Sequence, residues 1–343
     1  MRNERLFEPV LSSWLEKVGP ESDVVISSRV RLARNFKGWN FSGAGLELLE
    51  RVREVFGNDE DFPFLEMGDL SLLERGMLVE RYLISPEMMR RHGFGAVMIR
   101  EDETASVMFN EEDHIRIQCM APGLQLEQAL EDAFRLDDRF EAGMAYAFDK
   151  RLGYLTTCVT NVGTGLRASV MVHLPGLVAT KQLQKTIEAI RRYGFVVRGM
   201  YGEGSRPASN IFQISNQVTL GKTELEIVQD LSDVMEQVIM QERVCRTKLK
   251  QKFHIVMEDR IFRAYGMLKH SRILAQKEAA DAISDLRLGV QMGYIEHIPS
   301  QKVNELVLFS QPAFLRKFAQ RDMNELEEKV IRAAAIREIL DTY

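Results

Sequence analysis

Hydrophobic and polar positions along the chain follow two periods, which predict its helices and strands. A spacing of three to four residues between apolar positions predicts helices over 4–17, 44–57, 69–81, 124–136 and 177–193. Alternating or β-rich runs predict strands over 23–34, 95–100, 105–110, 114–120, 142–148, 153–158, 167–174, 194–201 and 210–220. The polar turn at 101–103 joins two of these strands and predicts an antiparallel meander.

After about residue 222 the helical period continues almost without interruption, and proline and glycine become sparse. The pattern therefore predicts an α+β domain of mixed strands and helices, followed by an all-α domain that begins between 225 and 255. The length of 343 residues also favours two domains. An apolar helical tail commonly packs on itself or on a second copy of the chain, and a helical cap on the core of the first domain explains the pattern equally well.

Charge and cysteine content exclude several classes of protein. The 45 Lys and Arg against 50 Asp and Glu give a net charge of −5, which argues against a general nucleic-acid binder. Cys119, Cys158 and Cys245 are too few and too dispersed for a disulfide framework, and none lies in a zinc-type pair. Because no apolar stretch reaches 18 residues and the N-terminus is charged, we expect a soluble, cytoplasmic protein that does not contact the membrane.

Two charged motifs are candidates for chemistry. In SSRVRLAR, Arg29 and Arg31 project from the same face of a strand and suit a polyphosphate, but this segment alone favours a solvated sheet face. In NEEDHIR (110–116), Glu111, Glu112 and Asp113 repel one another unless a metal, a guanidinium substrate or arginines lie near. The alternative for this motif is a solvated acidic turn.

Two glycine-containing segments follow. TTCVTNVGTGLRASV (156–170) surrounds Cys158 with small residues, and its Gly163 and Gly165 permit close backbone approach to a ligand. It is not a Walker A loop, and a free cysteine is usually a small buried hydrophobe. Residues 198–212 place Glu203 between glycines in a loop that suits a catalytic lid or an ordinary surface connection. His173 is expected in or near the core. Arginines, carboxylates, a glycine-rich loop and a cysteine together suit phosphoryl transfer.

The ordered motifs SSRVRLAR, NEEDHIR, TCVTNVGTGLRASV with HLP, RGMYGEGS, and ISNQ with LGKTE make the sequence similar to the phosphagen (guanidino) kinases. The closest resemblance is to the bacterial protein-arginine kinases, in which a helical domain follows the kinase domain and the family's small N-terminal helical domain is missing. The resemblance implies a glutamine-synthetase-like catalytic domain over 1–245, with an antiparallel sheet flanked by helices. It implies an all-α domain over 246–343 for dimerisation or docking.

The resemblance also implies the site. Glu112 would be the catalytic base, Glu203 a second carboxylate on the flexible loop, and Cys158 would lie beside the guanidinium. Five arginines would hold the phosphates of ATP: Arg29, Arg31, Arg116, Arg167 and Arg198. Mg²⁺ would be held mainly by nucleotide oxygens and water, with Glu111 reaching it through water and no direct protein ligand.

The implied function is phosphorylation of arginine side chains on proteins, in the stress response and as a tag for Clp proteolysis. Implied partners are protein substrates that include a heat-shock transcriptional repressor, a small zinc-containing activator protein, the ClpC–ClpP protease and a second copy in a homodimer. One alternative is a kinase of free arginine or another small guanidino compound. Another is a non-catalytic adaptor that recognises phosphoarginine or client proteins.

The sequence departs from the family pattern in two places. Val159 stands where a proline commonly follows the cysteine, which changes the shape of the loop but not its chemistry. In the tail, EKVIRA (Glu328 to Ala333) replaces the RDxxRA motif proposed to bind phosphoarginine, and only Arg332 and Ala333 match. The acidic Glu328 would repel a phosphate, which argues against an allosteric phosphoarginine pocket.

Overall fold

The computed structural model describes residues 4–8, 10–40, 45–90, 93–199 and 209–341. The chain forms two compact units that interleave along the sequence. The first comprises Met1–Trp14, Ser27–Val170 and Ser215–Ser232, and the second comprises Leu15–Ile26, Met171–Ile214 and Asp233–Tyr343. The domain boundary expected between 245 and 246 stays a prediction.

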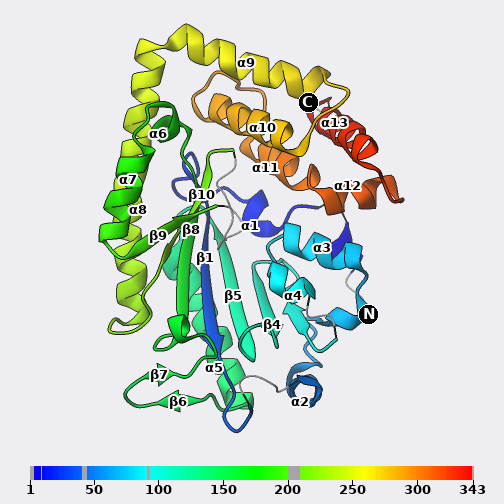
Figure 1. The fold of residues 1–343 in the computed structure, drawn as a ribbon, viewed down its shortest axis with the longest axis vertical. Helices are drawn as coiled ribbons and strands as arrows, with labels where there is room; N and C mark the ends of the chain where they lie inside the picture. The colour runs from blue at the N-terminus through cyan, green and yellow to red at the C-terminus, as the bar shows by residue number, and fades with distance from the viewer. Residues whose placement is uncertain (1–3, 9, 41–44, 91–92, 200–208, 342–343) are drawn as a thin grey trace. The chain divides into compact units, whose positions relative to one another are not determined.

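One eight-stranded sheet has the order β2-β3-β4-β5-β1-β8-β10-β9 (Figure 1). In this order its strands are Phe64–Glu66, Ala96–Ile99, Ala105–Phe109, Ile115–Pro122, Val25–Arg34, Leu166–His173, Ile211–Asn216 and Phe195–Arg198. A separate hairpin joins β6 (Phe148–Asp149) and β7 (Gly153–Tyr154). Strands β2, β3, β4, β5 and β1 pair with antiparallel register, which confirms the predicted meander and the α+β class.

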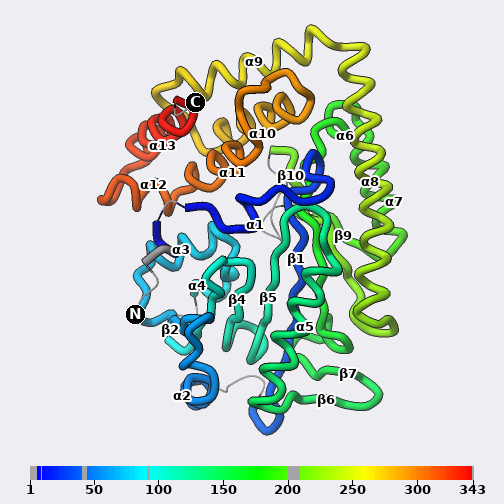
Figure 2. Tube along the Cα trace, turned by 180° about the vertical axis from the view of Figure 1, so that it is seen from behind, coloured from blue at the N-terminus to red at the C-terminus, as the bar shows by residue number. Residues whose placement is uncertain are grey.

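Helix α5 (Leu126–Gly143) packs against the sheet on the β5 side (Figure 2). Val30 and Leu32 of β1 are buried, as their alternation with arginines in the sequence predicts. Arg34 continues this inward series and pairs with Asp137 of α5 at 2.7 Å. Strand β1 therefore has one face that packs beneath α5 and an opposite face on which its other arginines lie. The same unit contains η1 (Glu4–Phe7), α1 (Ser13–Glu16), α2 (Gly45–Phe56), η2 (Met67–Asp69), α3 (Leu72–Glu80), α4 (Pro86–Arg90) and η3 (Val159–Asn161).

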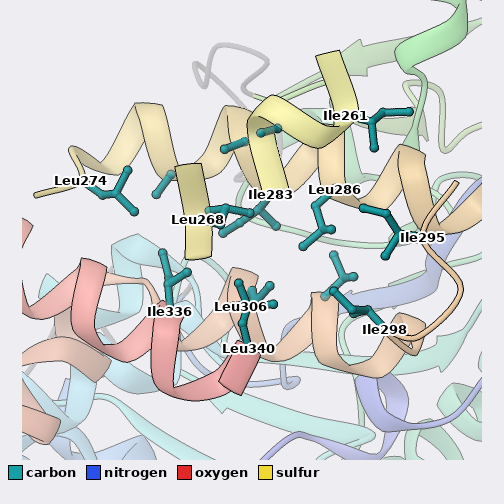
Figure 3. Close-up of a cluster of buried hydrophobic side chains, with 14 of the residues drawn as sticks. Ile261, Leu268, Leu274, Ile283, Leu286, Ile295, Ile298, Leu306, Ile336 and Leu340 are labelled. Atoms are coloured by element: carbon teal, nitrogen blue, oxygen red, sulfur yellow. The ribbon is translucent and has the colours of Figure 1, made fainter. Parts of the chain in front are cut away.

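Helices make up most of the second unit. They are α6 (Pro175–Ala179), α7 (Leu183–Arg192), α9 (His254–His270), α10 (Gln276–Gln291), α11 (Ser300–Phe309), α12 (Pro312–Ala319) and α13 (Glu325–Asp341), with α8 (Glu224–Lys252) entering from the first unit. Residues of α9, α10, α11 and α13 form a core in which Leu268, Leu286 and Ile336 are completely buried (Figure 3). The predicted helical tail therefore has a core of its own.

Several predicted elements differ from the structure. The helix expected over 4–17 is two short pieces, and the sequence has a proline at position 9 that cannot donate a helical hydrogen bond. The helix expected over 177–193 is interrupted at Lys181, whose φ of 59° is left-handed. The strands expected over 142–148 and 153–158 shrink to two residues each, while β2 and α4 were not predicted.

The arginine of the tail motif has a structural role. Arg332 is buried and donates to the backbone carbonyls of Ser310, at 3.0 Å, and Leu274, at 3.2 Å. Its remaining donor reaches Glu328 Oε1 at 2.5 Å, one turn earlier in α13. Within EKVIRA, the charges of Glu328 and Arg332 therefore satisfy each other. Throughout the part of the chain that the structure describes, no helix combines the length and the apolar character needed to cross a membrane.

Candidate active site

Three arginines share the face of the sheet that points away from α5. Arg29 and Arg31 lie two residues apart in β1, so their side chains project to the same side. Arg116 of β5 is directly opposite Ala33 of β1 in the antiparallel register. Residues directly opposite each other project to the same side, so Arg116 lies next to Arg31 on that face.

Strand β8 adds a fourth arginine. Ser169 Oγ accepts a hydrogen bond from Arg29 Nε at 3.3 Å, which places the Ser169 side chain on the arginine-bearing face. Arg167 is two residues from Ser169 in the same strand and therefore projects to that face as well. Four of the five arginines predicted from the sequence are thus brought together by β1, β5 and β8. We refer to Arg29, Arg31, Arg116 and Arg167 as the arginine cluster.

Like charges face one another within the arginine cluster. Burial and the charges of Arg116 and Arg167 lower the pKa of Arg29 to about 10. Burial and the three neighbouring arginines also lower the pKa of Arg31 well below its ordinary value. The buried Nε of Arg31 has no hydrogen-bond partner among the residues described. Like charges that face one another with an unsatisfied donor are an environment that a bound polyanion would stabilise.

Glu111 is the carboxylate associated with the arginine cluster. Its Oε1 accepts hydrogen bonds from Arg116 Nη1 at 2.6 Å and from Ser85 Oγ at 2.5 Å, and its Oε2 accepts the backbone N–H of Glu112 at 2.8 Å. Burial by itself would raise the pKa of Glu111. The charge of Arg116 and these hydrogen bonds outweigh burial and hold that pKa below its ordinary value. Glu111 is therefore an ionised, fixed partner of Arg116.

The predicted catalytic base, Glu112, is exposed in the loop that leads into β5. Its backbone N–H is held by Glu111, the carboxylate that pairs with Arg116 of the arginine cluster. An exposed carboxylate is accessible to a cationic substrate and can pair with it through charge-assisted hydrogen bonds.

Asn35, which directly follows β1, links two loops of the site. Its Nδ2 contacts Asp113 Oδ1 at 3.1 Å and the backbone carbonyl of Leu155 at 3.2 Å, and its Oδ1 accepts the N–H of His114 at 2.8 Å. Asp113 Oδ1 also accepts the backbone N–H of Thr157 at 2.6 Å. Asn35 and Asp113 therefore hold the 110–116 loop against the 155–158 loop.

Cys158 lies in the second of these loops and is half-buried. Its Sγ is 3.0 Å from Thr160 Oγ1, and its backbone carbonyl accepts a hydrogen bond from Thr156 Oγ1 at 2.8 Å. Thr157, which directly precedes Cys158, is hydrogen-bonded to Asp113. This contact holds Cys158 near the loop that carries Glu112. Sequence reasoning missed the roles of Asn35 and Asp113, although Asp113 lay inside a motif that it singled out.

Gly163 and Gly165 lie where this loop packs closely against other backbone segments. At Gly163, where φ is 111°, a Cβ would lie 2.3 Å from the backbone oxygen of Thr219. At Gly165, where φ is 62°, it would lie 2.4 Å from the backbone oxygen of Ala33. The close backbone approach that these glycines allow is therefore made to other segments of the chain itself.

Two predicted residues remain, Arg198 and Glu203. Arg198 is the last residue of β9 and belongs to the second unit. Glu203 lies outside the described residues. Within the described part of the chain, no group of three or more His, Cys, Asp and Glu side chains could hold a metal ion. His173 is buried as expected and contacts Ser284 Oγ at 2.9 Å.

Comparison with known proteins identifies the class that this fold and site define. Residues 47–245 match the family model described as "ATP:guanido phosphotransferase, C-terminal catalytic domain". Residues 254–343 match that of the "Protein-arginine kinase McsB C-terminal domain". Two solved structures share the fold. A duplicated taurocyamine kinase from Schistosoma mansoni with bound transition-state-analogue components has a TM-score of 0.59 and 24% identity, covering 67% of this chain and 35% of that one. A lombricine kinase has a TM-score of 0.55 and 23% identity, covering 70% and 73%.

Full-length relatives narrow the class. The chain is 64% identical to a protein-arginine kinase of Listeria welshimeri serovar 6b over 337 residues, which cover 98% of both proteins. It is 49% identical to a protein-arginine kinase of Geobacillus kaustophilus over 350 residues, which cover 99% of this chain and 96% of the relative. The chain belongs to the protein-arginine kinases of the guanidino phosphotransferase family. It is an ATP-dependent phosphotransferase that acts on guanidino groups.

Proposed function

We propose that the arginine cluster, together with Arg198, binds the phosphates of ATP. The observation that carries this proposal is the gathering of four arginines on one sheet face, where their like charges oppose one another and Arg31 has an unused buried donor. Fixed arginines in such a place neutralise the phosphates and the charge that develops on the transferring group. Guanidinium groups can also bind phosphate oxygens in pairs, which adds geometric specificity.

Mg²⁺ fits this site through the nucleotide rather than through a protein cage. We expect nucleotide oxygens and water to hold it, with Glu111 as the carboxylate that fits a water-mediated contact, because Glu111 is ionised and belongs to the arginine cluster's network. When bound, Mg²⁺ would offset part of the phosphate charge.

Glu112 would act as the base of the transfer step. A guanidinium is a poor nucleophile while it is protonated, so one nitrogen must lose a proton as it attacks. In the proposed step an N–P bond forms to the γ-phosphorus, the P–O bond to ADP breaks, and the carboxylate of Glu112 takes the proton. Glu203 would hold the guanidinium through a paired hydrogen bond, and Cys158 would orient it without forming a covalent intermediate.

Replacing Glu112 by alanine tests this assignment. We expect Glu112→Ala to abolish phosphoarginine formation on a mixed protein substrate while ATP still binds, because the phosphates are held by the arginine cluster. The measurements are radiolabel transfer from ATP into acid-labile phosphoarginine and direct nucleotide binding. Glu101→Ala, which changes an exposed glutamate in the turn between β3 and β4, is the matched control and should transfer at the wild-type rate. Wild-type turnover by Glu112→Ala would refute the base assignment.

We propose proteins, rather than free arginine, as the substrates that matter. The names of the full-length relatives and the match of the C-terminal helices support this choice. Radiolabelled ATP offered with free arginine and, separately, with an arginine-rich protein distinguishes the two substrates. Transfer to free arginine at a comparable kcat/KM would favour a kinase of small guanidino compounds, and an absence of ATP turnover with either would favour a non-catalytic adaptor.

The cellular role is likewise a proposal that rests on the family resemblance. We propose that the enzyme acts in the cytoplasm as a homodimer, phosphorylates a heat-shock transcriptional repressor and other proteins, and marks clients for the ClpC–ClpP protease. A small zinc-containing protein would activate it. Co-purification with these partners, compared between wild type and Glu112→Ala, would separate partner binding from catalysis.

A further inference from the structure

A serine outside the arginine cluster reaches into its network. Ser85 lies between α3 and α4, and its Oγ donates to Glu111 Oε1 at 2.5 Å. The same carboxylate oxygen accepts Arg116 Nη1 at 2.6 Å. Ser85 and Arg116 thus share one acceptor atom, so the hydroxyl acts on the arginine only through Glu111.

Glu111 depends on this hydroxyl for its orientation. Among the interactions described, its carboxylate accepts from Arg116, from Ser85 and from the N–H of Glu112. The Glu112 N–H restrains rotation about the last side-chain bond at Oε2. Ser85 and Arg116 oppose that rotation at Oε1. Removing the hydroxyl would leave the Glu111 carboxylate, and with it the Arg116 guanidinium, less restricted.

We propose that Ser85 is a positioning residue for the kinase reaction, which holds Glu111 so that Arg116 presents its guanidinium to the phosphates of ATP. This inference rests on the proposed phosphate-binding role of Arg116. It adds the segment before α4 to the machinery that binds the nucleotide. An arginine that is held by a fixed carboxylate loses less conformational freedom when the phosphate arrives, which strengthens binding.

Ser85 also has a purely structural contact. Its Oγ accepts the backbone N–H of Met88 at 3.0 Å, which caps the first turn of α4. A loss of activity in Ser85→Ala could therefore come from a weakened helix alone. The chain offers a matched control in Ser71, whose Oγ accepts the N–H of Glu74 and caps α3. Ser71 is exposed and makes no described contact with the arginine cluster.

Steady-state kinetics of three variants separate the two roles. We expect Ser85→Ala to raise the KM for ATP about tenfold, the size of one lost hydrogen bond to a charged group, with a smaller change in kcat. Ser85→Thr keeps a hydroxyl and should restore most of the nucleotide affinity. Ser71→Ala should leave the KM for ATP unchanged although it also removes a helix cap.

A double-mutant cycle with Glu111→Ala gives the decisive result. If Ser85 acts through Glu111, Ser85→Ala should have no further effect on the KM for ATP once Glu111 is gone. Additive effects, or an equal loss in Ser85→Thr, would overturn the inference. Arg116→Ala tests the underlying assumption separately. If that variant binds ATP normally, the proposed role of Arg116 fails, whereas a weakened Arg116→Ala beside a normal Ser85→Ala overturns only the role of Ser85.

Discussion

The buried pair of Arg34 and Asp137 allows a prediction about stability. The two side chains join β1 to α5 at 2.7 Å and are almost inaccessible to solvent. Removing one partner of a buried ion pair costs about 3–5 kcal/mol, because the remaining charge stays buried without compensation. In Asp137→Ala, Arg34 would keep the backbone carbonyls of Thr164 at 2.8 Å and Ala33 at 3.0 Å, and the ring of Tyr154.

These remaining contacts place the expected cost at the lower end, about 3 kcal/mol. With an unfolding entropy of about 2.1 cal/mol/K for each of the 343 residues, that corresponds to a fall in the melting temperature of roughly 4 °C. Thermal unfolding followed by circular dichroism measures it. Glu131→Ala is the matched control in α5, since Glu131 is 3.7 Å from Arg135 in an exposed pair. Its expected cost is below about 1 kcal/mol.

A second variant tests the reasoning rather than the contact. Burial raises the pKa of Asp137 even though Arg34 lies beside it, so the ion pair does not fully offset its own desolvation. We therefore expect the double variant Arg34→Met with Asp137→Leu to melt close to wild type. If the double variant is as unstable as Asp137→Ala, the loss comes from packing, and the argument from an uncompensated charge is refuted.

Three other predictions follow from the same structure. Asn35→Ala should lower kcat at least tenfold, because the two loops that it joins lose their common anchor; unchanged kinetics would contradict that role. Burial and nearby arginines lower the pKa of His173 well below 6.5, so the unfolded chain binds a proton that the folded chain does not. Stability should therefore fall as pH drops below about 6.5, by up to about 1.4 kcal/mol per pH unit, and urea titrations of His173→Gln should show a flatter pH profile. Gly163→Ala should destabilise by about 2 kcal/mol or more because its Cβ would meet the backbone oxygen of Thr219, whereas Gly266→Ala, which meets nothing within 4 Å, should not; equal melting temperatures would contradict this.

The sequence predicted those parts of the fold that depend on local periodicity. Alternation in β1 gave both the strand and the division between Leu32, which is buried, and Arg31, which faces the site. The helical period after 222 gave the C-terminal helices. The prediction of one helix failed where the apolar period continued past a residue with a left-handed backbone conformation, Lys181. Predictions also failed where strands are too short to show a period, as in β2 and β6.

Some residues of the candidate site were visible in the sequence, and others were assigned only through the family resemblance. Charged residues that interrupt a β-type pattern stand out, so Arg29 and Arg31, and the group of Glu111, Glu112 and Asp113, were visible in the sequence as candidates. Arg116 and Arg167 were assigned through resemblance, and the β1–β5 register and the Arg29–Ser169 bond now give a geometric reason for grouping them. The roles of the individual residues stay predictions.

Residues that position these groups leave no comparable trace in the sequence. Asn35 lies 78 positions from Asp113, and Ser85 lies 26 positions from Glu111. Asparagine and serine commonly occur at turns and at the start of helices, so the residue type of Asn35 and of Ser85 predicts only a turn or a cap. The second contact of each residue exists only because the fold brings a distant loop within hydrogen-bond distance. A cap residue that also contacts the site, such as Ser85, should therefore alter nucleotide binding when it is replaced, although it lies outside every motif. A cap residue without such a contact, such as Ser71, should not.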